Sequence, residues 1–433
     1  PENAHAHIAY RLKVPFYTSD IAHSEPIRYA AAIESAMIER LKADRGFAGL
    51  LTKNPLHPHW QNEFWTEYEY TLDELAEYLD LKGHPLRGSE VSGLGRNCEL
   101  FDTGCSGCQF QHMPTEHQRE LKREFLINTL RSYSVLSEVR VSKTLGGNST
   151  FGYRSKLTPR FDLPRRRRPD FLPNIGFRER GRFRITDVSK CLIASDAIND
   201  VLPKVREEVH NRIDEYARGA QLLLRDDGTG HVITDPREIV TTSICGIKFD
   251  YSAHDFFQVN HEVTEILVRE VLTRCDFEDV DYVADMYTGC GMFAVHIAAA
   301  SGERRRVVGV EVSSRAVECA RHNADRAGLS NVSFECGHSE SMFETLVVNS
   351  RFDPDRTCVV IDPPRNGCDE SFLSQLVSFA PRRLIYISCN PETLCRDLAS
   401  LAHIYQVNGE ILPLDMFPQT RHVESVVSLV KKG

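Results

Sequence analysis

The chain has 433 residues, a formal net charge of −9 and 13 cysteines. This length exceeds a single hydrophobic core and predicts several domains. No apolar run approaches the roughly 18 residues of a membrane helix, and the first residues lack the basic-then-apolar pattern of an export signal. An odd number of scattered cysteines without such a signal predicts reduced thiols and a cytoplasmic location. The acidic net charge argues against a protein that coats nucleic acid over its whole surface.

The first 82 residues differ in pattern from the rest of the chain. A helix is expected over Ile27–Leu41 and a second, short amphipathic helix over Thr71–Leu79, which opens on a capping box. Together with His5, His7 and the segment Lys53–Pro55, these residues resemble the plasmid replicase (primase-like) family. The resemblance implies a fragment of that family's catalytic domain that lacks its acidic metal-binding strands.

Four cysteines are candidates for a metal site. Cys98, Cys105 and Cys108 have the spacing C-x6-C-x2-C, and neighbouring glycines allow a tight ligand loop. Three thiolates need a fourth ligand, for which Cys191 is the best candidate. The spacing fits zinc or an iron–sulfur cluster, and three free thiols in a loop are the alternative.

The middle of the chain is basic and aromatic. Between Phe151 and Lys190, phenylalanine and tyrosine alternate with many arginines, and strands are expected over Tyr153–Phe161 and Gly176–Thr186, with Arg165–Arg168 on an exposed turn. Such strands suit single-stranded or loop RNA, because the cations hold phosphates and the rings stack on unpaired bases. A solvated hairpin rim is the alternative. The helix expected before this stretch, over Thr115–Tyr133, has three residues on a polar face: Gln118, Lys122 and Arg123.

From Asp250 onward, strand and helix patterns alternate, as in a doubly wound parallel sheet. Strands are expected over Tyr282–Tyr287, Val307–Glu311, Cys358–Ile361 and Leu384–Ile387. Gly289 and Gly291, after the first of these, let the backbone approach a ligand, and Glu311 can accept hydrogen bonds from ribose hydroxyls. The pattern predicts an adenosyl ligand. S-adenosylmethionine is favoured, and a dinucleotide remains possible although Ala294 replaces the third glycine.

Cys389 lies where a buried strand ends abruptly. The strand Leu384–Ile387 stops at Ser388, and Pro391 suits the first turn of a helix. Cys389 is therefore expected at the carboxyl edge of the sheet, where ligands bind, beside a helix N-terminus that lowers the pKa of a thiol. The alternative is a small buried cysteine that closes a strand.

Two carboxylates accompany this thiol. Asp362, in the sequence Asp362-Pro363-Pro364-Arg365, ends the preceding strand and is expected beside Cys389. Glu424 lies in a last strand, Arg421–Val427, whose alternation is otherwise that of a core strand, and a buried carboxylate is costly unless it has a role. The alternatives are a turn former for Asp362 and a surface acid for Glu424. Carbon 5 of uracil becomes nucleophilic once a thiolate has added to carbon 6, so a thiolate, a base and a methyl donor together suit its methylation.

From about residue 87 to the end, the chain resembles the RNA uracil-5-methyltransferase family, which makes 5-methyluridine in tRNA or ribosomal RNA. The motifs that carry the resemblance are Cys98…Cys105-Ser106-Gly107-Cys108-Gln109, Gly152–Lys156, Phe257–Asn260, Asp285–Gly291, Asp362–Arg365, Ser388–Pro391 and His422–Glu424. The resemblance implies a class I methyltransferase domain in which Cys389 is the nucleophile and Glu424 the base. It implies contacts to S-adenosylmethionine from Gln258, Tyr287, Glu311 and Asp362, and a four-iron cluster on Cys98, Cys105, Cys108 and Cys191. The Gly152–Pro159 run and the Asp285–Tyr287 turn look more like the eukaryotic-type tRNA members of the family, which favours a uridine in the T-loop of tRNA over one in ribosomal RNA.

These patterns predict an α/β protein in four parts. The expected parts are a replicase-like segment over 1–82, a cysteine-cluster segment over 83–132, a β-rich RNA-binding domain over 133–245 and a methyltransferase domain over 246–433. Two other functions compete with the uracil methyltransferase. One is a nucleic-acid-binding replication protein with the methyltransferase fold as a scaffold. The other is an amino-group methyltransferase, which the Asp362-Pro363-Pro364 turn also fits but which needs no thiol.

Overall fold

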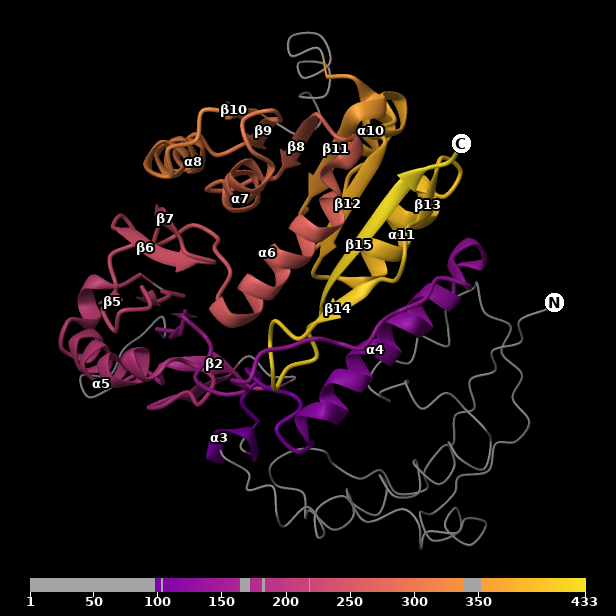
Figure 1. Cartoon of the computed structure of the whole chain (residues 1–433). Coiled ribbons are helices and arrows are strands. Elements are labelled where there is room, and N and C mark those ends of the chain that lie inside the picture. Colours follow the sequence, from indigo (N-terminus) through magenta and orange to yellow (C-terminus); the bar gives the residue numbers. More distant parts are fainter. Residues whose placement is uncertain (1–97, 103, 164–171, 181–183, 218, 338–351) are drawn as a thin grey trace, which may run out of the picture. The chain divides into compact units, whose positions relative to one another are not determined.

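The computed structural model describes residues 98–433 except 103, 164–171, 181–183, 218 and 338–351 (Figure 1). The chain divides into two compact units, Pro1–Arg96 and Asn97–Gly433. The helices expected over Ile27–Leu41 and Thr71–Leu79, and the turn Arg165–Arg168, lie outside the described residues. The finer domain boundaries expected from the sequence remain predictions.

An eight-stranded sheet organises the described part of the second unit, with the order β10-β9-β8-β11-β12-β15-β13 and with β14 paired to β15. Its strands are β8 (Tyr282–Met286), β9 (Arg306–Glu311), β10 (Val332–Cys336), β11 (Thr357–Ile361), β12 (Arg383–Ser388), β13 (Tyr405–Val407), β14 (Leu412–Leu414) and β15 (Glu424–Lys431). The pairs from β10 to β12 are parallel, as expected, whereas β12, β13 and β14 all pair with β15 in the antiparallel sense. The predicted parallel sheet is therefore confirmed from β10 to β12, and the sheet continues with antiparallel strands that the sequence did not indicate. The loop between β14 and β15 contains no crossover helix, so it reverses the chain and gives an antiparallel pair.

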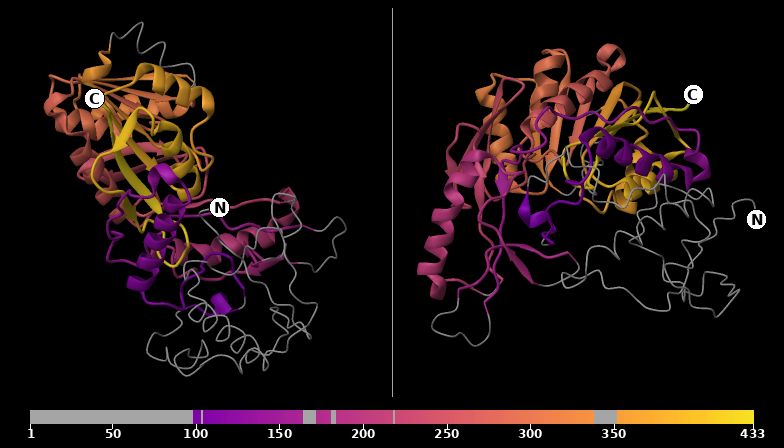
Figure 2. Two further views of the ribbon diagram at one scale, coloured as in Figure 1. Left: turned by 90° about the vertical axis from the view of Figure 1, so that its right-hand side faces the viewer. Right: turned by 90° about the horizontal axis from the view of Figure 1, so that it is seen from below.

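Helices cover both faces of this sheet (Figures 1 and 2). One face packs against α6 (His261–Cys275), α7 (Met292–Ser301) and α8 (Ser314–Arg326), and the other against α4 (Thr115–Arg131), α10 (Glu370–Phe379) and α11 (Pro391–Leu401). Successive residues of one strand enter opposite cores, as Val283 and Ala284 do in β8. Burial on both faces explains why these strands are continuous apolar runs in the sequence.

The central region is built from short strands. The three small sheets are β1 (Lys156–Leu157) with β4 (Leu224–Asp226) and β5 (Val232–Ile233), β2 (Gly176–Arg178) with β3 (Ile185–Asp187), and β6 (Ile239–Ile244) with β7 (Ile247–Ser252). Helix α5 (Asp196–Asn211) contributes Ile198 and Leu202 to a core with β1 and β4, whereas β6 and β7 pack into the core of the large sheet. The long strand expected over Tyr153–Phe161 is wrong, because only Lys156–Leu157 is regular and Arg154 and Arg160 form isolated bridges. Pro159 lacks the N–H that a continuous ladder would need.

Helix α4 confirms the helix expected after the cysteines, but its polar face is partly buried. Lys122 is 2% exposed, and its Nζ donates to Asp415 Oδ1 at 2.5 Å and to the Phe417 carbonyl at 3.0 Å. Arg119 also donates to Asp415, at 3.3 Å. The helix therefore holds the loop Asp415–Arg421, called the 415–421 loop below, through a buried ion pair.

We expect Lys122→Met to destabilise the protein by about 3–5 kcal/mol, because it leaves the buried Asp415 carboxylate with one partner in place of two. The measurement is the free energy of unfolding from urea titration. His117→Met introduces the same side chain at an exposed position of the same helix and should change stability by less than about 0.5 kcal/mol. Equal effects of the two substitutions on the free energy of unfolding would show that the ion pair does not stabilise the protein.

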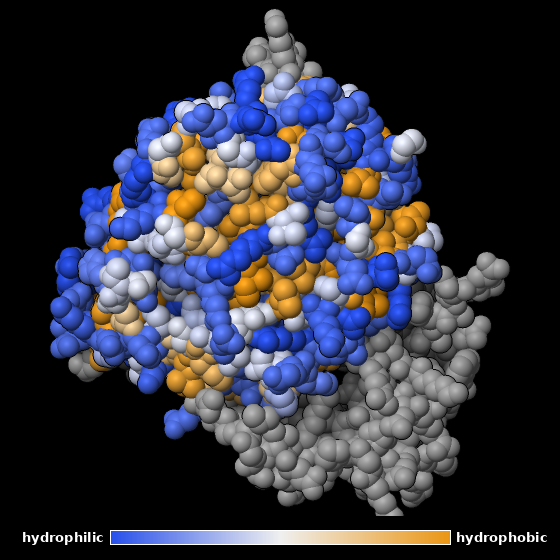
Figure 3. Space-filling view, viewed as in Figure 1, coloured by the Kyte–Doolittle hydropathy of each residue, from blue (hydrophilic) through white to orange (hydrophobic). Residues whose placement is uncertain are grey.

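Among the described helices, none is long and apolar enough to cross a membrane. The face in Figure 3 is mainly hydrophilic, with hydrophobic residues in separate groups between the polar ones.

Candidate active site

The carboxyl ends of the parallel strands bring the predicted residues to one edge of the sheet. In the register, Met286 pairs with Val310 and with Ile361. The residues that follow these positions are therefore neighbours along the edge: Glu311, Tyr287 and Asp362. The strand β12 lies next to β11 and ends immediately before Cys389. The expectation that Asp362 and Cys389 follow adjacent strands is confirmed.

Glu424 reaches the same edge from the opposite direction. Strand β15 is antiparallel to β12, with Ser388 opposite Ser425. One step further along this register places Cys389 opposite Glu424, which is the first residue of β15 and is 3% exposed. The alternative, that Glu424 is a surface acid on an edge strand, is thus excluded, because β15 lies between β12 and β13. The thiol and the carboxyl belong to two facing strand ends.

The electrostatic environment of Cys389 is opposite to that expected from the helix N-terminus alone. Burial raises the pKa of the Cys389 thiol to about 11, and the nearby carboxylates of Glu424 and Asp362 raise it further, while Arg365 acts in the opposite sense. Helix α11 begins at Pro391 as expected, with Asn390 as its N-cap. The predicted lowering of the thiol pKa is therefore wrong, because burial and two acids outweigh the helix.

We expect alkylation of Cys389 by iodoacetamide in the free protein to be slow at pH 7 and to accelerate about tenfold per pH unit up to pH 9, because the thiolate is the reactive form and its pKa lies near 11. Glu424→Gln removes a negative charge and should shift this profile to lower pH. Peptide mass spectrometry measures the modification at Cys389 itself. A flat profile over this range would contradict the buried, acid-flanked thiol.

The two carboxyl groups are themselves perturbed. Burial raises the pKa of Glu424, and the charge of Asp362 adds to the effect, while Arg365 lowers it. Burial and the charge of Asp285 raise the pKa of Asp362 to about 7. A carboxyl with a pKa of about 7, as Asp362 has, can exchange protons near neutral pH, as general acids and bases do.

The loop between β8 and α7 has the backbone that a ligand-binding turn requires. Gly289 and Gly291 have φ of +56° and +86°, and Tyr287 has φ of +65°, which is unfavourable for a residue with a Cβ. A Cβ at Gly291 would meet Ala320 and Phe334 at 3.1 Å. Glu311 holds this loop, since one carboxylate oxygen accepts from Gly289 N and the other from Ser313 N, each at 3.0 Å. Each oxygen keeps a lone pair for a ligand hydroxyl.

Asp285, in the middle of β8, is a site residue that the sequence analysis did not select. Its Oδ2 accepts from Thr288 Oγ1 at 2.5 Å and from Ala294 N at 2.9 Å, so it ties the loop to the first turn of α7. Its Oδ1 has no partner among the described residues, and burial raises its pKa to about 7. An acid inside an otherwise apolar strand was the available signal.

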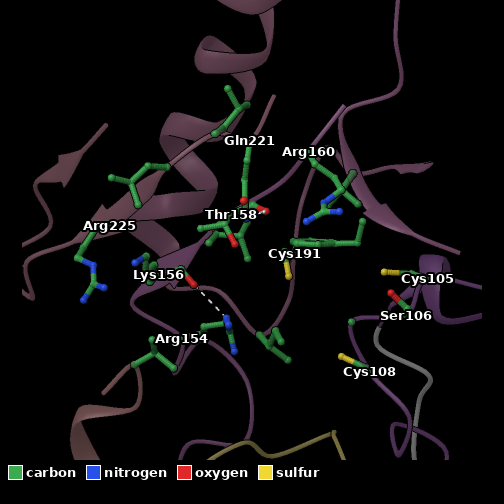
Figure 4. Close-up of a pocket in the computed structure, with 18 of the residues that line it drawn as sticks. Cys105, Ser106, Cys108, Arg154, Lys156, Thr158, Arg160, Cys191, Gln221 and Arg225 are labelled. Atoms are coloured by element: carbon green, nitrogen blue, oxygen red, sulfur yellow. Dashed lines mark hydrogen bonds between the residues drawn. The ribbon is translucent and has the colours of Figure 1, made fainter. Parts of the chain in front are cut away.

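A cavity of about 1220 Å³ adjoins this edge of the sheet. Gln258, which is 4% exposed, lines it together with Arg365 and His422, which stand close in the chain to Asp362 and Glu424. Many other lining residues are cationic or aromatic: Arg154, Lys156, Arg160, Arg178, Lys190, Arg212, Arg225, Phe101, Phe177, Phe256, Phe257 and Phe417. Figure 4 shows Arg154, Lys156 and Arg225 along one side of this space. Burial and the neighbouring cations, Arg365 first among them, lower the pKa of His422 to about 4, so this ring is neutral at physiological pH.

The four predicted ligand cysteines line the same cavity. Figure 4 shows the sulfur atoms of Cys105, Cys108 and Cys191 directed towards a common space. Burial raises the pKa of Cys108 to about 12 and that of Cys191 to about 11, and neighbouring thiols of the group add to both shifts. In the described part of the chain, no three side chains of histidine, cysteine, aspartate or glutamate are arranged to hold a metal ion. The metal site therefore stays a prediction.

Known families match two parts of the chain. The Replicase family matches residues 1–79, and the tRNA (Uracil-5-)-methyltransferase family matches residues 185–432. The tRNA (uracil(54)-C(5))-methyltransferase of Schizosaccharomyces pombe is 38% identical over 353 residues, which are 77% of this chain and 65% of that protein. The enzyme of the same name from Saccharomyces cerevisiae is 30% identical over 74% of this chain and 60% of its own length. The chain thus spans less than two thirds of the length of these curated relatives.

A solved structure shares the fold. The crystal structure of Pyrococcus abyssi tRNA (uracil-54, C5)-methyltransferase in complex with S-adenosyl-L-homocysteine has a TM-score of 0.58 and 24% identity, over 75% of this chain and 86% of that one. The match to the methyltransferase family covers more than half of the chain and includes both facing strand ends. The chain therefore belongs to the tRNA (uracil-5-)-methyltransferase family.

Proposed function

We propose that this protein methylates carbon 5 of a uridine in tRNA, at position 54 in the T-loop, with S-adenosylmethionine as the methyl donor. The observation that carries the proposal is the register that sets Cys389 opposite Glu424 at the edge where Tyr287 and Asp362 also lie. The fungal relatives named above are described as acting on uracil 54 of tRNA. A uridine of ribosomal RNA is the competing substrate.

The first chemical step belongs to Cys389. Its thiolate adds to carbon 6 of the uracil ring, a carbon–sulfur bond forms, and the electron pair of the C5–C6 double bond moves towards carbon 5 and the neighbouring carbonyl. Because the thiol pKa lies near 11 in the free protein, its proton must leave as the substrate binds. Glu424 and Asp362 are the carboxylates near enough to raise this pKa. Asp362, whose pKa is about 7, takes the thiol proton, so that Glu424 stays ionised for the second step.

The second step needs a base. Once carbon 5 has taken the methyl group, it carries both that group and its original hydrogen. Glu424 removes this proton, the double bond re-forms, and the carbon–sulfur bond breaks to return the thiolate of Cys389. A carboxylate whose pKa is raised by burial is a stronger base than an exposed one, which favours this transfer.

The methyl donor supplies an electrophilic methyl group when it is bound. We assign its adenosyl part to the loop of Gly289 and Gly291 with Glu311 for the ribose hydroxyls, as in other class I methyltransferase folds. Gln258, Tyr287 and Asp362 are the remaining contacts that we propose. The free Oδ1 of Asp285 fits a donor group of this ligand, since it is otherwise an unsatisfied buried acceptor.

The cavity suits RNA. Its arginines and lysines face few acids, and its phenylalanine rings offer surfaces on which unpaired bases stack. Phe256 lines the cavity and is 75% exposed, so its ring is accessible for stacking on a base. Cys389 and Glu424 do not line the cavity themselves, but Arg365 does, and its charge acts on both of them. We infer that the target base enters from the cavity past Arg365.

We propose that Cys98, Cys105, Cys108 and Cys191 hold a four-iron cluster, with zinc as the less favoured alternative. Burial, and next to it the neighbouring thiols, raise the pKa of Cys105, Cys108 and Cys191, so free thiolates are unfavourable here, and a cationic centre removes this cost. We expect anaerobically purified protein to show the broad visible absorption of thiolate–iron bonds, with iron and sulfide in the protein. Cys105→Ser should weaken this absorption, whereas Cys336→Ser, at an exposed thiol away from the group, should leave it intact. Zinc without iron would contradict the proposal.

The decisive experiment uses the full chain with S-adenosylmethionine and tRNA transcribed in vitro. The expected product is one 5-methyluridine per transcript, found by nucleoside mass spectrometry, and its absence from a matched transcript with cytidine at position 54. A transcript that contains 5-fluorouracil should form a denaturation-resistant adduct. A base removes the hydrogen of carbon 5 as a proton, but it cannot remove fluorine in this way, so the carbon–sulfur bond stays. Methylation of ribosomal RNA fragments in place of tRNA would overturn the choice of substrate, and a methylated amino group would overturn the reaction.

A further inference from the structure

The 415–421 loop leads directly into the strand that begins with Glu424. At its centre, Gln419 has φ of +68° although it carries a Cβ, and it is only 3% exposed. Such a conformation costs roughly 1–2 kcal/mol and persists where other contacts impose it. The contacts of Gln419 therefore help to set where the chain enters β15, together with the pairing of Leu414 with Glu424.

A pair of glutamines from distant parts of the chain imposes this conformation. Gln118 of α4 accepts from Gln419 N at 2.9 Å and donates through Nε2 to Gln419 Oε1 at 3.0 Å. Gln118 is fully buried, so water cannot replace these bonds. Its Nε2 also contacts the carbonyls of Phe110 and Met113, at 3.1 Å and 3.0 Å, which fixes the orientation of the amide.

The segment that follows Cys108 supports the same point. Gln109 N and Phe110 N both donate to the carbonyl of Gln419, at 2.8 Å and 2.9 Å. Gln109 also accepts, through its side chain, from Arg421 N at 3.3 Å. Every backbone polar group of Gln419 is thus held by residues between the last cysteine of the loop and the first turns of α4.

We propose that Gln118 is a positioning residue for Glu424: through Gln419 it sets the start of β15 and hence the place of the carboxyl that removes the proton from carbon 5. The inference rests on the proposed function. Cys389 has a second support, because it follows β12, which pairs with β11 as well as with β15. A change at Gln118 should therefore disturb the second step, proton removal, more than the first step, thiol addition.

Gln118→Met tests this separation, because methionine has a similar shape and makes none of the four side-chain hydrogen bonds. In single-turnover reactions of the full chain with tRNA and S-adenosylmethionine, a methylated protein–RNA adduct should accumulate on denaturing gels. Displacement of a catalytic group by about 1 Å lowers a rate by about 100-fold, so we expect release of the adduct to slow by about 10- to 100-fold. The rate of adduct formation should fall by much less.

A second variant and a control distinguish loss of the glutamine pair from a general loss of stability. Gln419→Met removes the other half of the pair, so the double variant should be no slower than either single variant. Leu126→Ala removes a fully buried side chain on the same helix that faces the apolar core, so it should lower stability without accumulation of adduct. The inference fails if Gln118→Met slows both steps equally, as a general loss of stability would, or slows neither. Failure of the proposed function is distinct, because the unmodified protein would then give neither 5-methyluridine nor an adduct with 5-fluorouracil RNA.

Discussion

Replacement of Cys389 by alanine should lower methyl transfer to tRNA by at least about 10⁴-fold and abolish the adduct with 5-fluorouracil RNA, because loss of a covalent nucleophile removes the low-energy path and leaves only binding and positioning. Carbon 5 of uracil has no other route to sufficient nucleophilicity at this site. Two assays measure the outcome: tritium from labelled methyl donor in 5-methyluridine, and mobility of protein–RNA complexes under denaturing conditions. Cys389→Ser should be almost as inactive, since a hydroxyl is a much weaker nucleophile than a thiolate at neutral pH.

The matched control is Cys395→Ala. Cys395 is a buried thiol on α11, six positions after Cys389, and it packs in the apolar core. We expect this variant to lose a little stability, on the order of 1 kcal/mol, and to keep its methyl transfer. If Cys389→Ala retained activity and the methyl group appeared on an amino nitrogen, the Asp362-Pro363-Pro364 turn would belong to an amino-group methyltransferase and the thiol chemistry would be wrong.

The sheet edge could be predicted because its signals are local. Buried parallel strands are short apolar runs in the sequence. One run is followed by a glycine-containing turn, another by an acid and two prolines, and a third by a cysteine and a proline that starts a helix. These signals placed Tyr287, Asp362 and Cys389 correctly. Glu424 was selected because burial of a carboxylate is energetically costly unless it has a role. The strands that pair with β15 could not be predicted, because β12 and β15 come from separate parts of the sequence.

Long-range pairs account for most of what the sequence analysis missed. The polar face of α4 was predicted, but not its partners: Lys122 contacts Asp415, 293 positions away, and Gln118 contacts Gln419, 301 positions away. The pKa of Cys389 was predicted with the wrong sign for the same reason, because Glu424 comes from a later strand. The helix N-terminus is a local feature and was visible, whereas the burial and charges that outweigh it depend on the tertiary structure.

Replacement of Glu424 by glutamine should convert the enzyme into one that methylates once and then stays bonded to its RNA. The amide is nearly isosteric with the carboxyl but cannot accept the proton from carbon 5, so thiol addition and methyl transfer proceed while release stops. We expect release to slow by about 10²–10⁴-fold, the range of a general base, so that a stoichiometric adduct forms with ordinary tRNA. In the unmodified protein such an adduct requires 5-fluorouracil. Glu410→Gln, at an exposed acid before β14, should release its product normally.

The pH dependence of RNA release from the adduct tests whether Glu424 itself accepts the proton. Burial and Asp362 raise the pKa of Glu424, and a carboxyl accepts a proton only above its pKa, so release should fail on the acid side at a pH well above the usual value of 4.5. Removal of the neighbouring charge in Asp362→Asn should lower that pKa and move the acid limit of release to lower pH. An adduct that releases at the same rate in Glu424→Gln and in the unmodified protein would assign the proton to another acceptor. Asp362 would be the first candidate, because its pKa near 7 and its place beside Cys389 meet the same requirements.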